Sequence, residues 1–474
     1  MMLLTNDQVV DLAIIAVLLI GVAQFRSVRR ARAGNLIAAA ALACSAWLVV
    51  YRYGLIDPGI AAAGLALGLL AGAWLAAKVN MVQIPAMIAF QHGAGALAAV
   101  LISFVELTRL PTADTVVRTL SGVLGMVVGA LTFTASMVAS GKLSKRMKQR
   151  PSFLLWHNTM LLAGIALAVF LSIPATRAPG AGYAYWLVLL AAVSGVLGVL
   201  FSIRVGGADM PVLISFLNAT AGLAAAFCGV AIGNRLLIAA GATVAASGSI
   251  LTYVMCEAMN RTLGHVLMPG KTPVQNPRIT EADRGVDALS EVSVTEATKT
   301  SDPLPAAAEA AIAVTSVIIV PGYGMAEGQA QHETVLLANQ LVSMGKKVRF
   351  AIHPVAGRMP GHMHVLLAEA DTDPDLLIEI DEANQAFRDT GLVIVVGACD
   401  VVNPAAITST GTPISGMPIL RADEAQNVVV CNLDRRPGYS GVENPLYDKA
   451  NTILLLGDAR VTLRQLREAL EAAK

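Results

Sequence analysis

The chain has 474 residues, of which 55% are hydrophobic and only 14% are charged, and its formal net charge is +1. This composition excludes an ordinary soluble protein, so we predict a membrane protein. The net charge says nothing about nucleic acid, but the chain has no basic tail, and we expect no nucleic-acid partner. The five cysteines lack the spacing of a metal site or a disulfide framework.

Hydrophobic residues are concentrated before residue 258, where we predict an all-α membrane domain, residues 1–260. A helix needs about 20 apolar residues to cross the hydrocarbon core of a membrane. Runs of this kind lie at about 7–25, 34–52, 58–77, 84–105, 117–140, 153–173, 183–203, 210–230 and 233–255. Their interiors are rich in Gly and Ala, which allows helices to approach closely in lipid. We therefore expect nine membrane-spanning helices.

The distribution of Lys and Arg predicts the orientation of these helices. Cytoplasmic loops carry an excess of positive charge. The loops after odd-numbered spans hold most of it, above all at residues 26–32 and 142–150, and the other loops hold less. We therefore expect the N-terminus outside and everything after the ninth span in the cytoplasm. The first ten residues lack the features of a removable signal peptide.

Two residues inside the predicted spans are candidates for moving a proton. Ionisable groups in a bilayer are costly and are functional candidates by default. His92 lies within the fourth span and can gain or lose a proton near physiological pH. Asn218 lies in the eighth span and could bond His92, water or another helix. The alternative for His92 is a buried side chain satisfied by a neighbouring helix.

Asp209, in the Gly206–Asp209 segment before the eighth span, is a candidate for coupling the membrane domain to a soluble domain. A charge on flexible backbone at the cytoplasmic mouth could face that domain. The alternative is a helix cap for the eighth span.

Residues 261–311 are predicted to form a linker. The segment is polar, contains Pro, Thr, Glu and Asp, and shows no sustained periodicity. A domain tethered in this way can move relative to its membrane anchor.

Residues 312–474 are predicted to form a Rossmann-like, doubly wound domain with a six-stranded parallel sheet. Apolar strand-like runs alternate with helical segments, as expected for a parallel sheet covered on both faces. The runs lie at 314–320, 346–354, 375–380, 391–400, 426–434 and 451–458. The last helix places Leu463, Leu466 and Leu470 on one face. The ligand crevice should lie beyond the carboxyl ends of strands one and four.

Both of those strands end in glycine. After strand one, the turn Gly322, Tyr323, Gly324, Met325, Ala326 is typical of a loop that lets backbone approach a pyrophosphate at the start of a helix. The alternative is an ordinary strand-to-helix turn. After strand four come Gly397 and Asp400. Asp400 either holds a hydroxyl or amide or caps the helix that begins near Asn403 and Pro404.

The end of strand two favours NADP(H) over NAD(H). An NAD site uses an acidic residue there, whereas an NADP site uses Arg for the 2′-phosphate. Here no acid follows the strand, and the segment reads His353, Pro354, Val355, Ala356, Gly357, Arg358. Lys346, Lys347, Arg349 and His353 are further basic candidates, but we favour Arg358 because guanidinium binds phosphate bidentately. The alternative is a solvated basic loop.

A second basic segment follows strand five. Arg435, Arg436 and Tyr439 are expected to form a lid over a phosphate or a ring, with a solvated turn as the alternative. We find no nucleophile–base pair, metal cluster or Walker loop in this half of the sequence. A hydride reaction needs none, because the cofactor carries the chemistry. With one dinucleotide site, the second redox partner must come from elsewhere.

These motifs resemble the beta subunits of proton-translocating NAD(P) transhydrogenases over essentially the whole chain. PGYGMA, VRFAIHPVAGRMPGHM, GACDVVNPAA, GYSGVENPLY and LLLGDA resemble the NADP(H)-binding domain, and GGADMPVLISFLN and SGKLS resemble membrane motifs. The resemblance implies an inner-membrane enzyme whose alpha subunit binds NAD(H), with hydride passing from NADH to NADP+ as a proton moves inward. It also implies a dimer of protomers in membrane lipid.

The resemblance assigns roles to individual residues as well. It implies that Gly322 and Gly324 approach the pyrophosphate, that Arg358 holds the 2′-phosphate, and that Asp400 lies near the nucleotide. Arg436 and Tyr439 would belong to the lid, and His92 and Asn218 would line the proton route.

Two positions depart from the family pattern. Glu327 stands where the family has a small or aliphatic residue, and we expect its carboxylate to point away from the phosphates. The family's Lys-Arg pair after strand five corresponds to Asn432 and Leu433, and the basic pair is displaced to Arg435 and Arg436.

Rival interpretations are a transporter or channel whose cytoplasmic domain senses NADP(H), and a purely structural membrane anchor.

Overall fold

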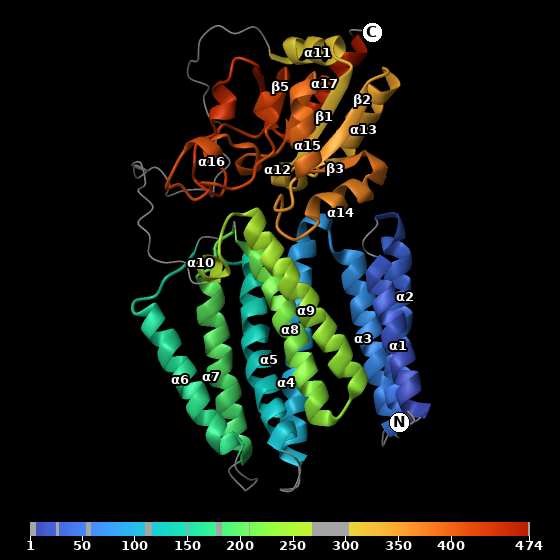
Figure 1. Ribbon diagram of the computed structural model, residues 1–474, viewed down its shortest axis with the longest axis vertical. Helices are drawn as coiled ribbons and strands as arrows, with labels where there is room; N and C mark the ends of the chain where they lie inside the picture. Colours follow the sequence, from blue (N-terminus) through green and yellow to red (C-terminus); the bar gives the residue numbers. More distant parts are fainter. Residues whose placement is uncertain are drawn as a thin grey trace.

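Nine long helices precede a soluble α/β domain in the computed structural model (Figure 1), which describes residues 6–24, 28–53, 58–109, 116–148, 151–176, 183–207, 209–267 and 303–472. The nine helices are α1 (Asn6–Ala23), α2 (Val28–Tyr53), α3 (Pro58–Lys78), α4 (Ile84–Arg109), α5 (Val116–Leu143), α6 (His157–Ala175), α7 (Tyr183–Ile203), α8 (Met210–Ile232) and α9 (Arg235–Ala258). Eight of them are long and apolar enough to cross a membrane, whereas the stretch Ala62–Lys78 of α3 is a shorter apolar helix. Each predicted span corresponds to one helix, and the protein is a membrane protein with a soluble C-terminal domain.

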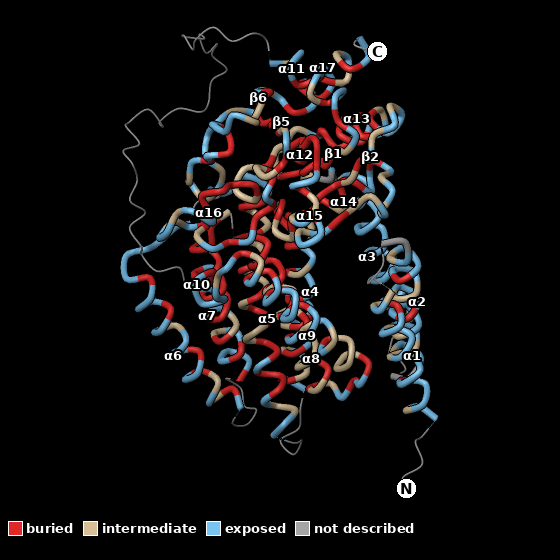
Figure 2. Tube along the Cα trace, turned by 45° about the horizontal axis from the view of Figure 1, so that its top comes forward, coloured by how far each residue is buried: buried red, intermediate tan, exposed pale blue. Residues whose placement is uncertain are grey.

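Small residues bring the central helices together. A side chain at Gly222 of α8 would place its Cβ 2.6 Å from the backbone nitrogen of Ala245 in α9, and one at Gly241 would lie 2.5 Å from that of Ala226. The predicted role of Gly and Ala in close helix packing is therefore confirmed for α8 and α9. In Figure 2, α5 and α8 are largely buried, whereas α1, α2 and α3 form a more exposed group at one side.

The soluble domain is the predicted doubly wound sheet. Its strands are β1 (Ser316–Pro321), β2 (Lys347–Ile352), β3 (Leu377–Glu379), β4 (Leu392–Val396), β5 (Asn427–Asn432) and β6 (Thr452–Leu456). They are all parallel, in the order β3-β2-β1-β4-β5-β6. The order reverses between β1 and β4, which is where a ligand crevice is expected.

Helices cover both faces of this sheet. They are α11 (Pro303–Ala313), α12 (Tyr323–Glu327), α13 (Gln331–Ser343), α14 (His362–Glu369), α15 (Ile380–Ala386) and α17 (Ala459–Ala472), whereas α16 (Ala405–Thr408) packs in a small separate cluster. Val317 and Ile319 of β1 pack on the side of α11, α13 and α17, and Ile318 and Val320 pack on the side of α15. The leucines of α17 are fully buried, as predicted.

One helix prediction was wrong. The sequence after the glycine turn predicts a single helix, but the structure has the separate helices α12 and α13. Gln329 adopts a left-handed φ of 49°, and the Ala330 amide turns back to the carbonyl of Met325 at 2.9 Å. This turn ends α12 after five residues.

The region between the two domains is described only in part. Residues 268–302 of the predicted linker lie outside the described residues, as do Arg26, Arg150 and Arg177 of the orientation argument. Helix α10 (Leu263–Leu267) packs with the membrane helices, whereas α11 belongs to the core of the soluble domain.

The soluble domain contacts the membrane helices through the loop after β2, at the carboxyl ends of the strands. Met359, in the loop after β2, is 5% exposed and belongs to the same buried cluster as Met210 and Leu213 of α8 and Met255 of α9. Val355 of the same loop packs against this cluster. A soluble-domain side chain is thus part of the core of the membrane domain.

Polar contacts surround this apolar contact. Arg261 binds the Asp209 carboxylate at 2.8 Å and the Pro413 carbonyl at 3.0 Å, so it joins the start of α8 to the soluble domain. Asn260 donates to the Ser415 carbonyl at 3.2 Å. Lys145, in the loop after α5, forms an ion pair with Glu327 at the end of α12. We call this set of interdomain contacts the docking contact. It consists of Met359 in the membrane-domain core, the bonds of Asn260 and Arg261 to residues 413–415, and the Lys145–Glu327 ion pair.

The docking contact predicts a specific cross-link. In a background with Cys44 and Cys399 replaced by Ser, the pair K145C and E327C should react with a short bifunctional maleimide, because the native side chains meet. The pair K145C and E309C is the control, since Glu309 is exposed on α11, at the far end of the soluble domain (Figure 1). Cross-linking of the control pair with equal yield, or of neither pair, would contradict the docking contact.

Candidate functional site

The carboxyl ends of β1 and β4 meet in a tight backbone contact. The Gly322 amide donates to the Val396 carbonyl at 2.8 Å, and the Gly324 amide donates to the Gly397 carbonyl at 2.7 Å. A Cβ at Gly322 would lie 2.5 Å from the Cα of Ala398, and one at Gly324 would lie 2.7 Å from the Cα of Gly397. The absence of side chains in the β1 turn therefore makes room for the β4 turn, and both lie at the predicted crevice.

The residues of the β1 turn divide between core and crevice. Met325 and Ala326 are fully buried in the core of the soluble domain. Tyr323 instead lies beside the loop after β2, with its ring centroid 6.1 Å from that of Tyr439. Met325 and Ala326 can thus offer a ligand only their backbone.

Arg358 lies against these two tyrosines. Its guanidinium carbon is 4.2 Å from the ring centroid of Tyr323 and 5.4 Å from that of Tyr439, and it donates a hydrogen bond to the Tyr439 hydroxyl. The residue is only 5% exposed. The structure therefore brings together the three predicted residues Tyr323, Arg358 and Tyr439, from three separate segments.

The other basic candidates near β2 lie elsewhere. Lys346 donates to the carbonyls of Ile312 and Val314, and Arg349 pairs with Glu382 at 3.2 Å. Lys347 begins β2 and so lies at the amino end of the strand, away from the crevice. Arg358 is therefore the candidate from this segment whose charge lies at the carboxyl ends of the strands.

His353 has a structural role within the loop that carries Arg358. Its Nδ1 accepts a hydrogen bond from the Val355 amide at 3.2 Å, and its Nε2 lies 2.8 Å from the Pro418 carbonyl. Burial lowers its pKa to about 4, so the ring is neutral at physiological pH. Pro354 and Ala356 continue the loop, and Gly357 has a φ of 108°, where a Cβ would lie 2.6 Å from the Cβ of His362.

Asp400 holds the loop 433–444, which we call the lid. Its carboxylate accepts the Ser440 amide at 3.0 Å and the Ser440 hydroxyl at 2.6 Å. Burial raises the pKa of Asp400, while these hydrogen bonds lower it. Asn403 accepts the Ala405 amide at 2.9 Å at the start of α16. The hydroxyl and the amide that Asp400 binds thus belong to the lid, and the side chain that accepts an amide at the start of α16 is that of Asn403.

The basic pair of the lid faces surface acids. Arg435 forms an ion pair with Asp448, and Arg436 has its Nε 3.6 Å from Asp434 and a side chain that is 88% exposed. Asn432 donates to the Ala398 carbonyl and to the Tyr447 hydroxyl, each at 2.8 Å. Asn432, which departs from the family pattern, is thus a buried residue that links the end of β5 to Ala398 and Tyr447.

Glu327, the other departure, belongs to the docking contact. Its carboxylate is paired with Lys145 of the membrane domain. Its position at the end of α12 is therefore explained by an interdomain ion pair, which a sequence pattern within the soluble domain does not reveal.

The candidate residues in the membrane domain lie on neighbouring helices. His92 of α4 and Asn218 of α8 are both half-buried, and no hydrogen bond joins them. Nδ1 of His92 and the hydroxyl of Ser136 in α5 have no partner among the described residues. Thr132 of α5 bonds Thr220 of α8 at 2.9 Å. Polar groups of α4, α5 and α8 therefore occur along the centre of the bundle.

Asp209 does not cap α8 with its side chain. Its side chain is 13% exposed, and the carboxylate binds Arg261 instead. Burial raises the pKa of Asp209, and the Arg261 charge opposes this effect. The cap alternative is therefore wrong, and the residue pairs with Arg261 of the docking contact.

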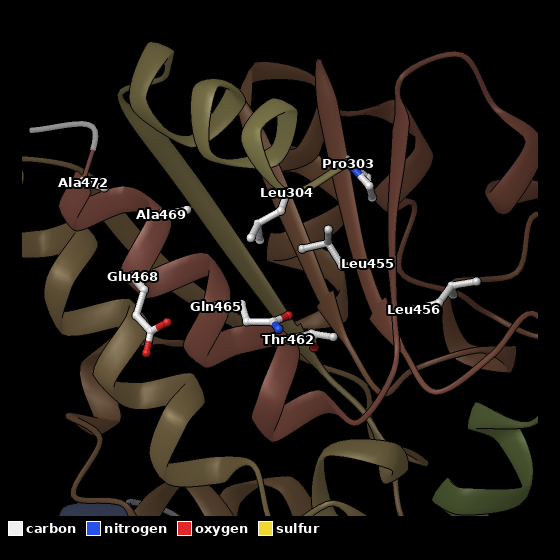
Figure 3. Close-up of a pocket in the computed structure, with 9 residues that line it drawn as sticks. All are labelled: Pro303, Leu304, Leu455, Leu456, Thr462, Gln465, Glu468, Ala469 and Ala472. Carbon is white, nitrogen blue, oxygen red and sulfur yellow. The ribbon is translucent and has the colours of Figure 1, made fainter. Parts of the chain in front are cut away.

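A separate pocket lies at the far edge of the sheet, between α11, β6 and α17 (Figure 3). Its lining includes Leu304, Leu455, Gln465 and Glu468. Two strands, β4 and β5, separate β6 from β1. This pocket has no cationic lining residue and is not part of the candidate site.

Sequence reasoning missed two residues of the site. Ser440 fastens the lid to Asp400, and His362 accepts the Arg358 amide at Nδ1, 3.1 Å away. Both lie within motifs that were recognised, GYSGVENPLY and VAGRMPGHM. A polar side chain within a recognised phosphate or lid motif is the signal that would have found them.

Comparisons with known proteins agree with this geometry. The profile of the family described as NAD(P) transhydrogenase beta subunit matches residues 7–469. The chain belongs to this family. It is 39% identical to NAD(P) transhydrogenase subunit beta of Rhodospirillum rubrum over 415 residues, and this alignment covers 86% of each chain. The same identity and coverage hold for the subunit from strain ATCC 11170 of that organism. The family resemblance predicted from the motifs is thus confirmed.

Membership of the transhydrogenase beta-subunit family agrees with the two-part architecture. The matched region covers the apolar helices as well as the six-stranded domain. The two departures, Glu327 and Asn432, lie inside the matched region and make contacts that the structure accounts for.

The attachment of the lid can be tested by hydrogen exchange. S440A removes the hydroxyl that binds Asp400, and a hydrogen bond to a charged group contributes about 1.5 to 3 kcal/mol. Amides of the lid should exchange at least about tenfold faster. S343A, which removes a surface hydroxyl at the end of α13, is the control. Unchanged lid exchange in S440A would show that Asp400 does not hold the lid.

Proposed function

We propose that this chain is the NADP(H)-binding beta subunit of a proton-translocating NAD(P) transhydrogenase. Hydride would pass from NADH to NADP+ while a proton moves inward across the membrane. The observation that carries the proposal is Arg358, a buried guanidinium at the carboxyl end of the β2 segment, where an NAD site would have an acid. Membership of the transhydrogenase family supports it.

The residues present fit NADP(H). Arg358 would hold the 2′-phosphate in place of the hydrogen bond that its Nη2 now donates to the Tyr439 hydroxyl, because phosphate is the stronger acceptor. The turn Gly322–Ala326 and Gly397 would lie along the pyrophosphate with their backbone. The loop of His353, Pro354, Val355, Ala356 and Gly357 would shape the site around Arg358.

The lid would cover the bound nucleotide. Asp400 fastens it through Ser440, and Tyr439 lies over Arg358. Arg435 and Arg436 would approach a phosphate only after leaving Asp448 and Asp434. The nicotinamide ring supplies the hydride chemistry when bound, and the chain's own residues orient and cover it.

The partner would be an alpha subunit that binds NAD(H), because the strand order of the soluble domain reverses at one place and so provides for one dinucleotide. The name of the related subunit beta supports such a partner. We place the enzyme in the inner membrane as a dimer of protomers in lipid. The N-terminus would lie outside and the soluble domain in the cytoplasm. The docking contact supports the cytoplasmic position of the soluble domain, because the positively charged loop after α5 contacts this domain.

The proton route would pass His92 and Asn218 and reach the soluble domain at Asp209. The orphan groups of His92 and Ser136, near the centre of the bundle, are suited to water or a proton. Asp209 and Arg261 connect the mouth of α8 to the segment 413–415. One charge that crosses the membrane gains about 2.3 kcal/mol per 100 mV, which is about a 50-fold shift of an equilibrium.

The proposed function predicts coupled activity in vesicles that contain this chain and the alpha subunit. NADPH should reduce an NAD analogue there, and the same vesicles should move protons across their membrane. H92A should lose most of the proton movement, because the relay group is removed, with H364A on the surface of α14 as the control. A pH-sensitive dye and the absorbance of the analogue measure the two processes.

Two results would contradict the proposal. Proton movement without any hydride transfer would favour a transporter that senses NADP(H). Undiminished proton movement alongside normal transhydrogenation in H92A would remove His92 from the route.

A further inference from the structure

Two buried histidines, His353 and His362, lie at the two ends of the loop that carries Arg358. The Nδ1 atom of each accepts a hydrogen bond from a backbone amide of this loop. Nδ1 of His353 accepts the Val355 amide at 3.2 Å, and Nδ1 of His362 accepts the Arg358 amide at 3.1 Å. Each residue is 1% exposed, and burial lowers the pKa of each ring to about 4. A neutral ring whose Nδ1 accepts a hydrogen bond carries its proton on Nε2. Both residues therefore present an Nε2–H donor.

The two donors differ in what they meet. His353 donates to the Pro418 carbonyl at 2.8 Å. Nε2 of His362 has no hydrogen-bond partner among the described residues. Buried donors in folded proteins are nearly always paired, and each exception calls for an explanation. The unpaired donor of His362 calls for an acceptor.

The surroundings of His362 indicate which acceptor is suitable. Its ring centroid lies 6.4 Å from that of Tyr323, whose ring is covered by the Arg358 guanidinium. The Arg358 charge adds to burial in lowering the pKa of His362. An anion with several oxygens can accept from the guanidinium and from a neutral N–H at the same time. A second cation at this place would be repelled by Arg358, and a neutral imidazole is not.

We propose that His362 is a further phosphate-binding residue, whose Nε2–H donates to an oxygen of the same 2′-phosphate that Arg358 binds. This inference rests on the NADP(H) function proposed above. It also supplies a second donor for the phosphate in a chain whose lid arginines are paired with Asp448 and Asp434. In this arrangement Nδ1 positions the Arg358 backbone, and Nε2 contacts the ligand.

Two amide replacements separate the two nitrogens of the ring. H362Q keeps an N–H donor close to the position of Nε2, whereas H362N keeps an acceptor close to Nδ1 and has no donor at Nε2. H364Q is the matched control, because His364 lies on the same helix, is partly exposed and has its Nε2 3.6 Å from Glu379. The measurement is the dissociation constant of the full chain in detergent for NADPH, NADH and adenosine 2′-monophosphate.

H362N should bind NADPH and adenosine 2′-monophosphate about tenfold more weakly, which corresponds to about 1.4 kcal/mol, and should bind NADH as the wild type does. H364Q should stay within about threefold of the wild type, which is less than the loss of one such hydrogen bond. H362Q should weaken NADPH binding less than H362N does, because it keeps the donor that contacts the phosphate. The unfolding temperature of each variant without nucleotide shows whether the fold is kept.

Three outcomes would overturn the inference. The first is equal weakening of NADPH and NADH in H362N, which would assign the residue to the loop structure alone. The second is unchanged NADPH binding in H362N, which would mean that Nε2 meets only water. The third is a loss in H362Q as large as that in H362N. Failure of the proposed function is distinguishable, because the wild-type chain itself would then show no preference for NADPH over NADH.

Discussion

The rest of the structure depends on the close contact between the turns after β1 and β4. Gly322 and Gly324 donate their amides to β4 carbonyls, and Gly397 turns away with a left-handed φ of 64°. A side chain at any of the three would overlap the neighbouring backbone. Because the two central strands end together, the crevice, the Arg358 loop and the lid anchored at Asp400 share one edge of the sheet.

The same edge of the sheet faces the membrane domain. The loop after β2 and helix α12 therefore take part both in the predicted crevice and in contacts with the membrane helices. The loop after β2 carries Arg358 into the crevice, and its next residue, Met359, enters the core formed by α8 and α9. Helix α12 follows the glycine turn and ends at Glu327, which pairs with Lys145. Under the proposed function, a nucleotide that moves either loop would change a contact with the helices. Nucleotide binding and proton movement would then share a set of residues through which each could affect the other.

The structural features that the sequence predicts correctly are those that depend on hydrophobic periodicity and on local motifs. The six strands, their parallel order and the buried leucines of α17 follow from apolar runs and spacing, and they are confirmed. The break between α12 and α13 was missed because it depends on a left-handed Gln329 and on packing. The partners of Glu327 and Arg435 come from residues distant in the chain or from surface acids, and no local pattern indicates them. Arg358 could be proposed from the sequence because its charge lies within a local motif.

The most direct test of the account is a structure of the full chain with NADP+ bound. The account predicts the 2′-phosphate within hydrogen-bonding distance of the Arg358 guanidinium and the pyrophosphate along the turn Gly322–Ala326. The Glu327 carboxylate should point away from the phosphates. A 2′-phosphate held by Arg435 and Arg436 while Arg358 stays on Tyr439, or a Glu327 carboxylate against the pyrophosphate, would contradict it.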